Sequence, residues 1–493
     1  MKKIPFREIF INDGNNGEGK TKIIVRTMCN VYLTFMTILS LVIISNSETI
    51  ATQTAMSLYG LAAVILIVRI SVSNKMVLFG PAYIIMMYTI VSNFGYDILV
   101  MAFPDVMYPM ISSIRHAYTE FFNQANALYY LGTISFVFGF ELIKVNHPAA
   151  KAEIKKLCDS FSPGEKSLYM KLSLAFIYIY VVYLVFEVIT GRLPLTNYLA
   201  VKDYMSTNTA LMYMLRITWI SMPTYMFFAE HTMKDLSPFI PVVGGMFVIL
   251  MFTGNRNEIL YPLAMTMGVF IWKRRYLEGK GVPQYFIPAS LFLVFVLNPM
   301  ISNSRKVGFN TLLSGSYGFV ESLMEMGQQL NPFSIILSAL ERGQYSFQNG
   351  MTIIVPCVSV LSLNLLYGTK MYQSSEYNPT YVLHQLGHKG RGFSYIAEMY
   401  INFGLIGTVI SFFLFGMYSG RVESGKCGKN VLLFYFQIST LFMLWVRNTL
   451  SLNIVIVVFA VLFQLFVRDF SEIKNNRKLN RFYRKLKVIM GWR

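Results

Sequence analysis

Charged residues and cysteines are both scarce in this chain. Of its 493 residues, 14% are Asp, Glu, Lys or Arg, against 54% that are hydrophobic. Soluble domains average about 25% charged residues, so this composition excludes an ordinary soluble protein. The four cysteines are Cys29, Cys158, Cys357 and Cys427. We expect only Cys357 to face outward, so no disulfide framework is available.

Short motifs of nucleotide and metal enzymes are also missing. No GxGxxG pattern precedes a helix, and GxxxxGK[ST], CxxC and HExxH do not occur. We therefore expect no ATP hydrolysis by this chain, and we expect its function to be driven by a gradient, a partner or an activated substrate. His384 and His388 (HQLGH) have the i, i+4 spacing that can bind a metal. Without a clear third ligand we expect no metal there and no cofactor.

Long apolar runs are what the chain has in quantity. They recur at lengths of roughly 18 residues or more, enough for a helix to cross ~30 Å of hydrocarbon. The sequence therefore predicts an all-α polytopic membrane protein. We place twelve membrane helices at 27–45, 50–68, 77–96, 124–143, 172–190, 209–229, 237–252, 258–272, 282–299, 396–416, 431–446 and 451–467.

Basic residues distinguish the two sides of this arrangement. With the N-terminus inside, the inner segments hold roughly 31 of the 43 Lys and Arg residues. Shifting the topology by one span would reverse this bias, so we expect both termini to be cytoplasmic. The net charge of +18 then reflects orientation and adhesion to anionic membrane lipids, not nucleic-acid binding.

Five segments follow from these spans. They are a cytoplasmic N-terminus (1–26), membrane helices one to nine (27–299), a large outer loop (300–395), membrane helices ten to twelve (396–467) and a basic cytoplasmic tail (468–493). Within the outer loop, 317–341 has helical apolar spacing interrupted at Asn331-Pro332. The run 351–367 is short for a span, so we expect a re-entrant or interfacial helix.

Arginines accumulate on the expected outer side. Their guanidinium groups bind phosphate oxygens through a planar fork and remain charged, which suits a pyrophosphate. Arg256, in the tight turn TGNRNE, and Arg447, in LWVRNTLSLN, are held at the membrane surface by the spans around them. A single arginine of this kind often only contacts lipid headgroups. The full set is Arg192, Arg256, Arg305, Arg342, Arg391 and Arg447.

The segment 390–410 (GRGFSYIAEMYINFGLIGTVI) concentrates ionisable groups at the mouth of the tenth span. Arg391, Tyr395 and Glu398 are spaced by four and three, so they share one face if the helix begins before Arg391. Gly404 and Gly407 favour close helix packing. Glu398 either anchors the helix through an ion pair or transfers protons beside a cationic site, and His388 is an alternative general base.

The chain resembles O-antigen polymerases, the Wzy-type polymerases of bacterial oligosaccharide repeat units. The resemblance rests on the GxGFSxIAExYINFGxIG pattern, the outer TGNR turn and the long outward loop late in the chain. It is sharpest over 251–410.

The resemblance implies a C-type glycosyltransferase fold in the bacterial cytoplasmic (inner) membrane. It implies transfer of a growing glycan from undecaprenyl pyrophosphate to the non-reducing end of a lipid-linked repeat unit, on the outer face, without nucleotide or metal. The product is a surface polysaccharide: O-antigen, capsule or exopolysaccharide. A chain-length regulator and a flippase of the same pathway are the expected protein partners. Catalytic candidates are Glu398, His388 and Arg391, and substrate-binding candidates are Arg256, Arg305, Arg342, Arg447 and Tyr395.

Two other classes stay open on sequence alone. One is a flippase or transporter of the same lipid-linked oligosaccharide, and the other is an O-antigen ligase. Flippases also have about twelve spans and buried arginines. They usually have short loops, so an outer segment of about 95 structured residues (300–395) favours the polymerase.

Overall fold

The computed structural model of this chain describes helices in every part where it assigns regular structure. The described residues are 20–73, 75–114, 116–143, 147–193, 201, 204, 208–230, 233–252, 256–280, 282–284, 288, 319–361, 375–388, 392–450 and 454–475. No strand occurs among them, which confirms the all-α class. They divide into two compact units.

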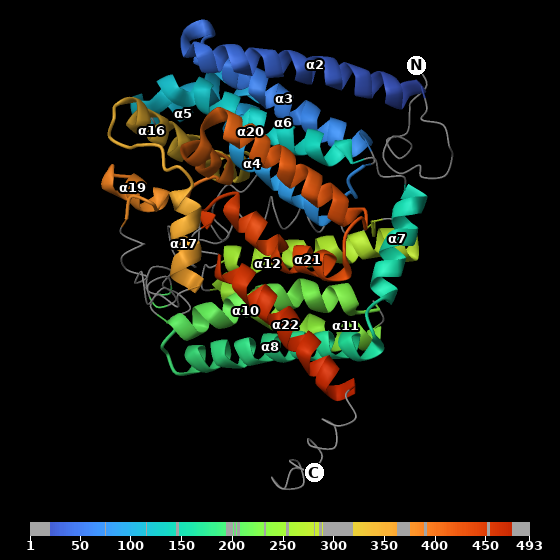
Figure 1. The fold of residues 1–493 in the computed structure, drawn as a ribbon. Coiled ribbons are helices and arrows are strands. Elements are labelled where there is room, and N and C mark those ends of the chain that lie inside the picture. Colours follow the sequence, from blue (N-terminus) through green and yellow to red (C-terminus); the bar gives the residue numbers. More distant parts are fainter. Residues whose placement is uncertain are drawn as a thin grey trace. The chain divides into compact units, whose positions relative to one another are not determined.

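The first unit contains Met1–Lys151, Phe270–Lys426 and Leu441–Ile454. Its helices lie side by side in the order α2, α3, α4 and α2, α6, α20 (Figure 1). Their bounds are α2 (Lys20–Ser45), η1 (Ser47–Thr49), α3 (Thr52–Ser73), α4 (Pro81–Ala102), α5 (Pro104–Ile114), η2 (His116–Phe121), α6 (Phe122–Leu142), η3 (Arg274–Glu278), α15 (Phe319–Met326), η6 (Gly327–Gln329), α16 (Leu330–Glu341), α17 (Met351–Leu361), α19 (Pro379–Gln385) and α20 (Tyr395–Glu423).

The second unit contains Ala152–Val269, Cys427–Thr440 and Val455–Arg493. In it α8 packs against α10, α11 and α22. Helix α8 begins with a capping box, because Ser162 and Glu165 each accept from the other's backbone N–H. The bounds are α8 (Pro163–Ile189), α10 (Thr209–Phe228), α11 (Met233–Phe252) and α22 (Val455–Asn475). Residues of α7 (His147–Asp159), α12 (Arg256–Lys273) and α21 (Lys429–Trp445) are divided between the units.

Eleven of the twelve expected spans coincide with long helices, and most of 282–299 lies outside the described residues. Among the described residues, six helices are long and apolar enough to cross a membrane, so a multi-pass membrane protein is supported. These six segments are Lys22–Ser45, Thr52–Ser73, Pro81–Ala102, Pro163–Ile189, Lys234–Met251 and Tyr395–Glu423. The total of twelve stays a prediction.

Helices α6 and α20 run parallel and approach closely through glycine. A Cβ on Gly139 would lie 2.1 Å from the carbonyl oxygen of Phe413, and one on Gly416 would lie 2.1 Å from that of Phe136. Real Cβ atoms do not come so close to a backbone oxygen, so this packing requires glycine on both helices.

The expectation that Gly404 and Gly407 provide close packing was wrong for the described residues. A Cβ on Gly404 would meet nothing within 4 Å, and one on Gly407 would meet only the side chain of Phe403 on the same helix. Gly404 instead has φ +65°, where it kinks α20. Its role is conformational, because only glycine adopts this backbone geometry without strain.

The helical segment at 317–341 is interrupted, but not at Asn331-Pro332. The break is the short η6, and Pro332 lies in the first turn of α16. A proline there loses no helical hydrogen bond, which is why it does not end the helix. Gly327 in η6 packs against Gly95 of α4, where a Cβ would lie 2.8 Å from the Gly95 backbone. The run at 351–367 forms α17 over its first 11 residues, and 362–367 lie outside the described residues, so the re-entrant or interfacial helix stays a prediction.

Candidate functional site

Glu398 lies at the N-terminal end of α20 and is completely buried. One carboxylate oxygen accepts from the Thr352 hydroxyl at 3.0 Å. The other accepts from Trp445 Nε1 at 2.6 Å and from the backbone N–H of Leu450 at 3.0 Å. Hydrogen bonds to a charged group contribute about 1.5–3 kcal/mol each. The carboxylate therefore joins α20 to α17 and to the segment that follows α21.

A second set of contacts reinforces the junction between α17 and α20. Asn402, one turn after Glu398, donates to the Thr352 hydroxyl at 2.6 Å. Its side-chain oxygen accepts from the backbone N–H of Gly350 at 3.0 Å. The three polar side chains are buried, and each satisfies another, so the start of α17 is rigidly placed beside α20.

Arg447 lies against the chain that leads into α20. Its carbonyl oxygen accepts from the N–H of Phe393 at 3.2 Å, and its guanidinium donates to the carbonyl of Glu325 at 3.3 Å. A Cβ on Gly392 would lie 2.0 Å from the Arg447 carbonyl oxygen. Glycine is thus required in the GRGF motif because two backbone segments touch there.

His388 and Arg342 both contact η2. The ring of His388 is half-buried, and its Nε2 lies 3.0 Å from the hydroxyl of Tyr118. The exposed guanidinium of Arg342 lies 3.3 Å from the carboxylate of Glu120. A surface pair of this kind contributes little stability, so Arg342 can exchange Glu120 for an anionic ligand at small cost.

Tyr395 does not reach the surface. It is the first residue of α20, fully buried, with its hydroxyl 2.7 Å from the Thr89 hydroxyl of α4. Arg391, Tyr395 and Glu398 would share one helical face only if the helix began before Arg391, and this condition is not met, because α20 begins only at Tyr395. Ser394, the residue at the N-cap, is extended, so the chain before it cannot continue the helix.

Several candidates lie outside what the structure describes. Arg305 and Arg391 are not described, and the side chain of Arg256 is not described although its backbone begins α12. Arg192, in the second unit, is exposed and 3.9 Å from the buried carboxylate of Glu187. His384 is exposed on α19. Among the described residues no three His, Cys, Asp or Glu side chains gather as metal ligands would.

Sequence analysis assigned no role to the ionisable groups Arg216, Glu258 and Asp97. In the second unit Arg216 lies 3.6 Å from Glu258 and stacks on Trp219, its Cζ 3.8 Å from the ring centroid. In the first unit Asp97 is fully buried and accepts from Asn126 at 2.7 Å. The available signal was an ionisable residue within an apolar run, which is a functional-site hypothesis by default.

Comparisons with known proteins agree with the resemblance in the sequence. The family model of the O-antigen polysaccharide polymerase Wzy matches residues 28–478. Protein CapE of Staphylococcus aureus is 26% identical over 270 residues, 54% of this chain and 56% of that relative. The chain thus matches little more than half of the relative's length. No solved structure matches. Since the model match covers nearly all of the sequence, the chain belongs to the O-antigen polysaccharide polymerase Wzy family.

Proposed function

We propose that this protein polymerises undecaprenyl-pyrophosphate-linked oligosaccharide repeat units into a surface polysaccharide. Family membership supports polymerisation, and six apolar helices support a multi-pass membrane protein. The basic inner segments favour the bacterial cytoplasmic membrane, with both termini in the cytoplasm and the reaction on the outer face. The activated donor makes a nucleotide unnecessary, and we propose that no metal takes part.

The observation that carries the proposal is the junction around Glu398. Its carboxylate places the Trp445–Leu450 backbone beside α20. That backbone carries Arg447, whose carbonyl contacts Phe393. The junction thereby holds one cationic side chain beside the segment that follows Arg391 in sequence. We propose that Arg447, Arg391, Arg342 and Arg305 bind the pyrophosphate and the charged parts of the substrates.

His388 is the proton acceptor that the geometry favours. The acceptor sugar hydroxyl attacks the anomeric carbon of the donor, the bond to pyrophosphate breaks, and the electron pair leaves with the phosphate oxygen. The hydroxyl proton passes to the imidazole of His388, held by Tyr118 through Nε2. His388 is half-buried and can meet a substrate, whereas Glu398 is enclosed by its three donors.

Glu398 and Tyr395 are then positioning residues. The role of Arg256 is proposed separately. Buried Tyr395 fixes the start of α20 to α4 through Thr89. Arg256 begins α12, and the fork geometry of its guanidinium suits a phosphate. It belongs to the second unit, so we propose an individual contact of Arg256 with the lipid pyrophosphate.

The decisive experiment is polymerisation in detergent. Purified protein, incubated with lipid-linked repeat units and EDTA but no nucleotide, should produce a ladder of glycans that grow by one repeat unit. A transporter cannot form the ladder, because detergent removes the two compartments between which it works. A ligase would transfer a glycan once to a different acceptor. Glycans that stay at one repeat unit, from protein that remains folded, would contradict the proposal.

A further inference from the structure

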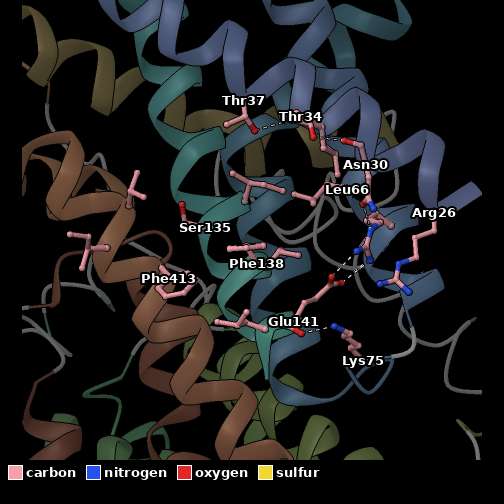
Figure 2. Close-up of a pocket in the computed structure, with 17 residues that line it drawn as sticks. Arg26, Asn30, Thr34, Thr37, Leu66, Lys75, Ser135, Phe138, Glu141 and Phe413 are labelled. Atoms are coloured by element: carbon pink, nitrogen blue, oxygen red, sulfur yellow. Dashed lines mark hydrogen bonds and ion pairs between the residues drawn. The ribbon is translucent and has the colours of Figure 1, made fainter. Parts of the chain in front are cut away.

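The first unit contains a groove that the proposed reaction does not use. Its volume is about 880 Å³, within the range of ligand-binding pockets. Helix α6 forms its floor, and α2 and α20 supply its walls (Figure 2). The floor includes Ser135 and Phe138, the α2 wall includes Thr34 and Thr37, and the α20 wall includes Phe413.

The groove lies further along α20 than Glu398, at the middle of that helix. It is lined by the C-terminal half of α6 and by Val409–Phe413 of α20. Glu398 lies in the first turn of α20. From Arg26 to Thr37 helix α2 rises about 16 Å, close to half of the ~30 Å hydrocarbon core. The groove is therefore as long as one leaflet of a bilayer.

Cations gather at one end of this groove. Arg69, nearly buried, donates through both terminal nitrogens to the carboxylate of Glu141 at 2.7 Å and through Nε to Asn30 at 2.7 Å. Arg26 and Lys75 line the same end (Figure 2). Three cations and one carboxylate leave a net charge of +2 at the mouth.

The remaining lining is mostly apolar and open to the side. Phe138, Leu142 and Ile410 are 63%, 52% and 51% exposed. Ile410 lies on α20, which is long and apolar enough to cross a membrane, and Phe138 and Leu142 lie on α6, which coincides with the span expected at 124–143. Such surface meets lipid tails in a bilayer, so a chain from the surrounding leaflet can enter laterally. A small soluble anion would use the cations but leave the apolar walls without a partner.

We propose that this groove binds an anionic phospholipid of the leaflet next to the N-terminal end of α2. The phosphodiester lies between Arg26 and Lys75, with Arg69 fixed beside it by Glu141, and one acyl chain lies along α6 between α2 and α20. The positive charge at the mouth of the groove favours an anionic headgroup. The length of the groove, which matches one leaflet, favours a membrane lipid. The site is independent of the proposed polymerisation.

Native mass spectrometry of the purified full chain tests this binding. Titrated with phosphatidylglycerol in detergent, the protein should retain one lipid tightly, and phosphatidylcholine should bind much more weakly. The double variant Arg26→Gln/Lys75→Gln should weaken phosphatidylglycerol binding about thirtyfold, because each basic residue near a surface contributes about a factor of five. The matched control Lys155→Gln/Lys156→Gln removes two charges from exposed positions on α7 and should leave binding unchanged.

A second variant tests the groove without changing charge. Thr34 is exposed on the α2 wall, so Thr34→Trp should fold and should block the acyl chain, again lowering retention of phosphatidylglycerol. Equal retention of phosphatidylcholine, an equal loss in the α7 control, or unchanged binding by Thr34→Trp would each overturn the proposal. Preferential binding of undecaprenyl phosphate over phosphatidylglycerol would also overturn it, because the occupant would be a polyprenyl lipid.

Discussion

At the scale of single residues, Glu398 and His388 differ in what they can reach. His388 precedes the tenth expected span and Glu398 lies near its start. Either type of side chain can accept a proton. The carboxylate of Glu398 is fully buried and occupied by three donors, whereas the ring of His388 is half-buried with Tyr118 as a partner. The two residues should therefore fail in different ways when they are replaced.

Replacement of His388 should affect the chemical step. His388→Ala should lower the rate of ladder formation by about 10²–10⁴-fold, the usual contribution of a general base, while substrate binding remains. His384→Ala is the matched control, because His384 lies four positions earlier and is exposed. Normal ladders from His388→Ala, with the rate measured under single-turnover conditions, would remove the proton-accepting role from His388.

Replacement of Glu398 should affect the placement of the Trp445–Leu450 segment and not the chemical step directly. In Glu398→Gln an amide N–H₂ faces donors that a carboxylate satisfied, so the Trp445–Leu450 segment should loosen. Hydrogen exchange of the amides at 445–450 should accelerate, and the KM for lipid-linked substrate should rise. Glu48→Gln, at an exposed position, is the control. A fall in kcat with unchanged exchange and unchanged KM would instead make Glu398 the base.

Conservative changes of the arginines test anion binding. Arg447→Lys, Arg391→Lys and Arg256→Lys keep a positive charge but lose the bidentate fork, so each should abolish most polymer at normal protein level. Arg421→Lys, at an exposed position near the other end of α20, should leave polymer length unchanged. The readout is the polysaccharide pattern of cells that express each variant. Full-length polymer from any one of the three would assign that arginine a structural role.

At the scale of secondary-structure elements, α6 and α20 depend on each other through glycine. Gly139→Ala would place a Cβ 2.1 Å from the Phe413 carbonyl oxygen, so the helices must separate. Overpacking of this kind costs about 1–3 kcal/mol. The thermal unfolding midpoint in detergent should fall. Gly244→Ala on α11, where a Cβ meets nothing within 4 Å, should leave the midpoint unchanged or raise it slightly. Equal midpoints for both variants would contradict this packing.

Two predictions from sequence patterns differ from the structure at the boundaries of helices. Asn331-Pro332 is a frequent turn signal, but proline fits the first turn of α16 and the break lies at Gly327–Gln329. The i, i+4 spacing of Arg391 and Tyr395 does not place the two residues on one helical face, because α20 starts at Tyr395. Both outcomes arise because local spacing does not reveal where tertiary contacts begin a helix.

At the scale of the whole molecule, the topology can be tested by cysteine labelling. Burial raises the pKa of the Cys357 thiol, so its thiolate fraction is small and it should react slowly. His384→Cys is a better reporter of the outer loop, since His384 is exposed. A membrane-impermeant maleimide should label His384→Cys in intact cells, but Cys158 and Cys427 only after permeabilisation. Labelling of Cys158 or Cys427 in intact cells would refute the inside N-terminus.

Sequence alone determined the all-helical class and the family. Apolar runs, scarce charge and the bias of basic residues are properties of local composition. Each apolar segment inserts into the membrane, and each basic loop orients its neighbours, because of the residues that it contains itself. The GxGFSxIAExYINFGxIG pattern led to the polymerase family, which the match over 28–478 confirms. Only the tertiary structure decided which side chains meet. The partners of Glu398, at Thr352, Trp445 and Leu450, are 46, 47 and 52 positions away. Such contacts leave no periodic signal, because they arise from the packing of helices and not from the order of residues within one helix.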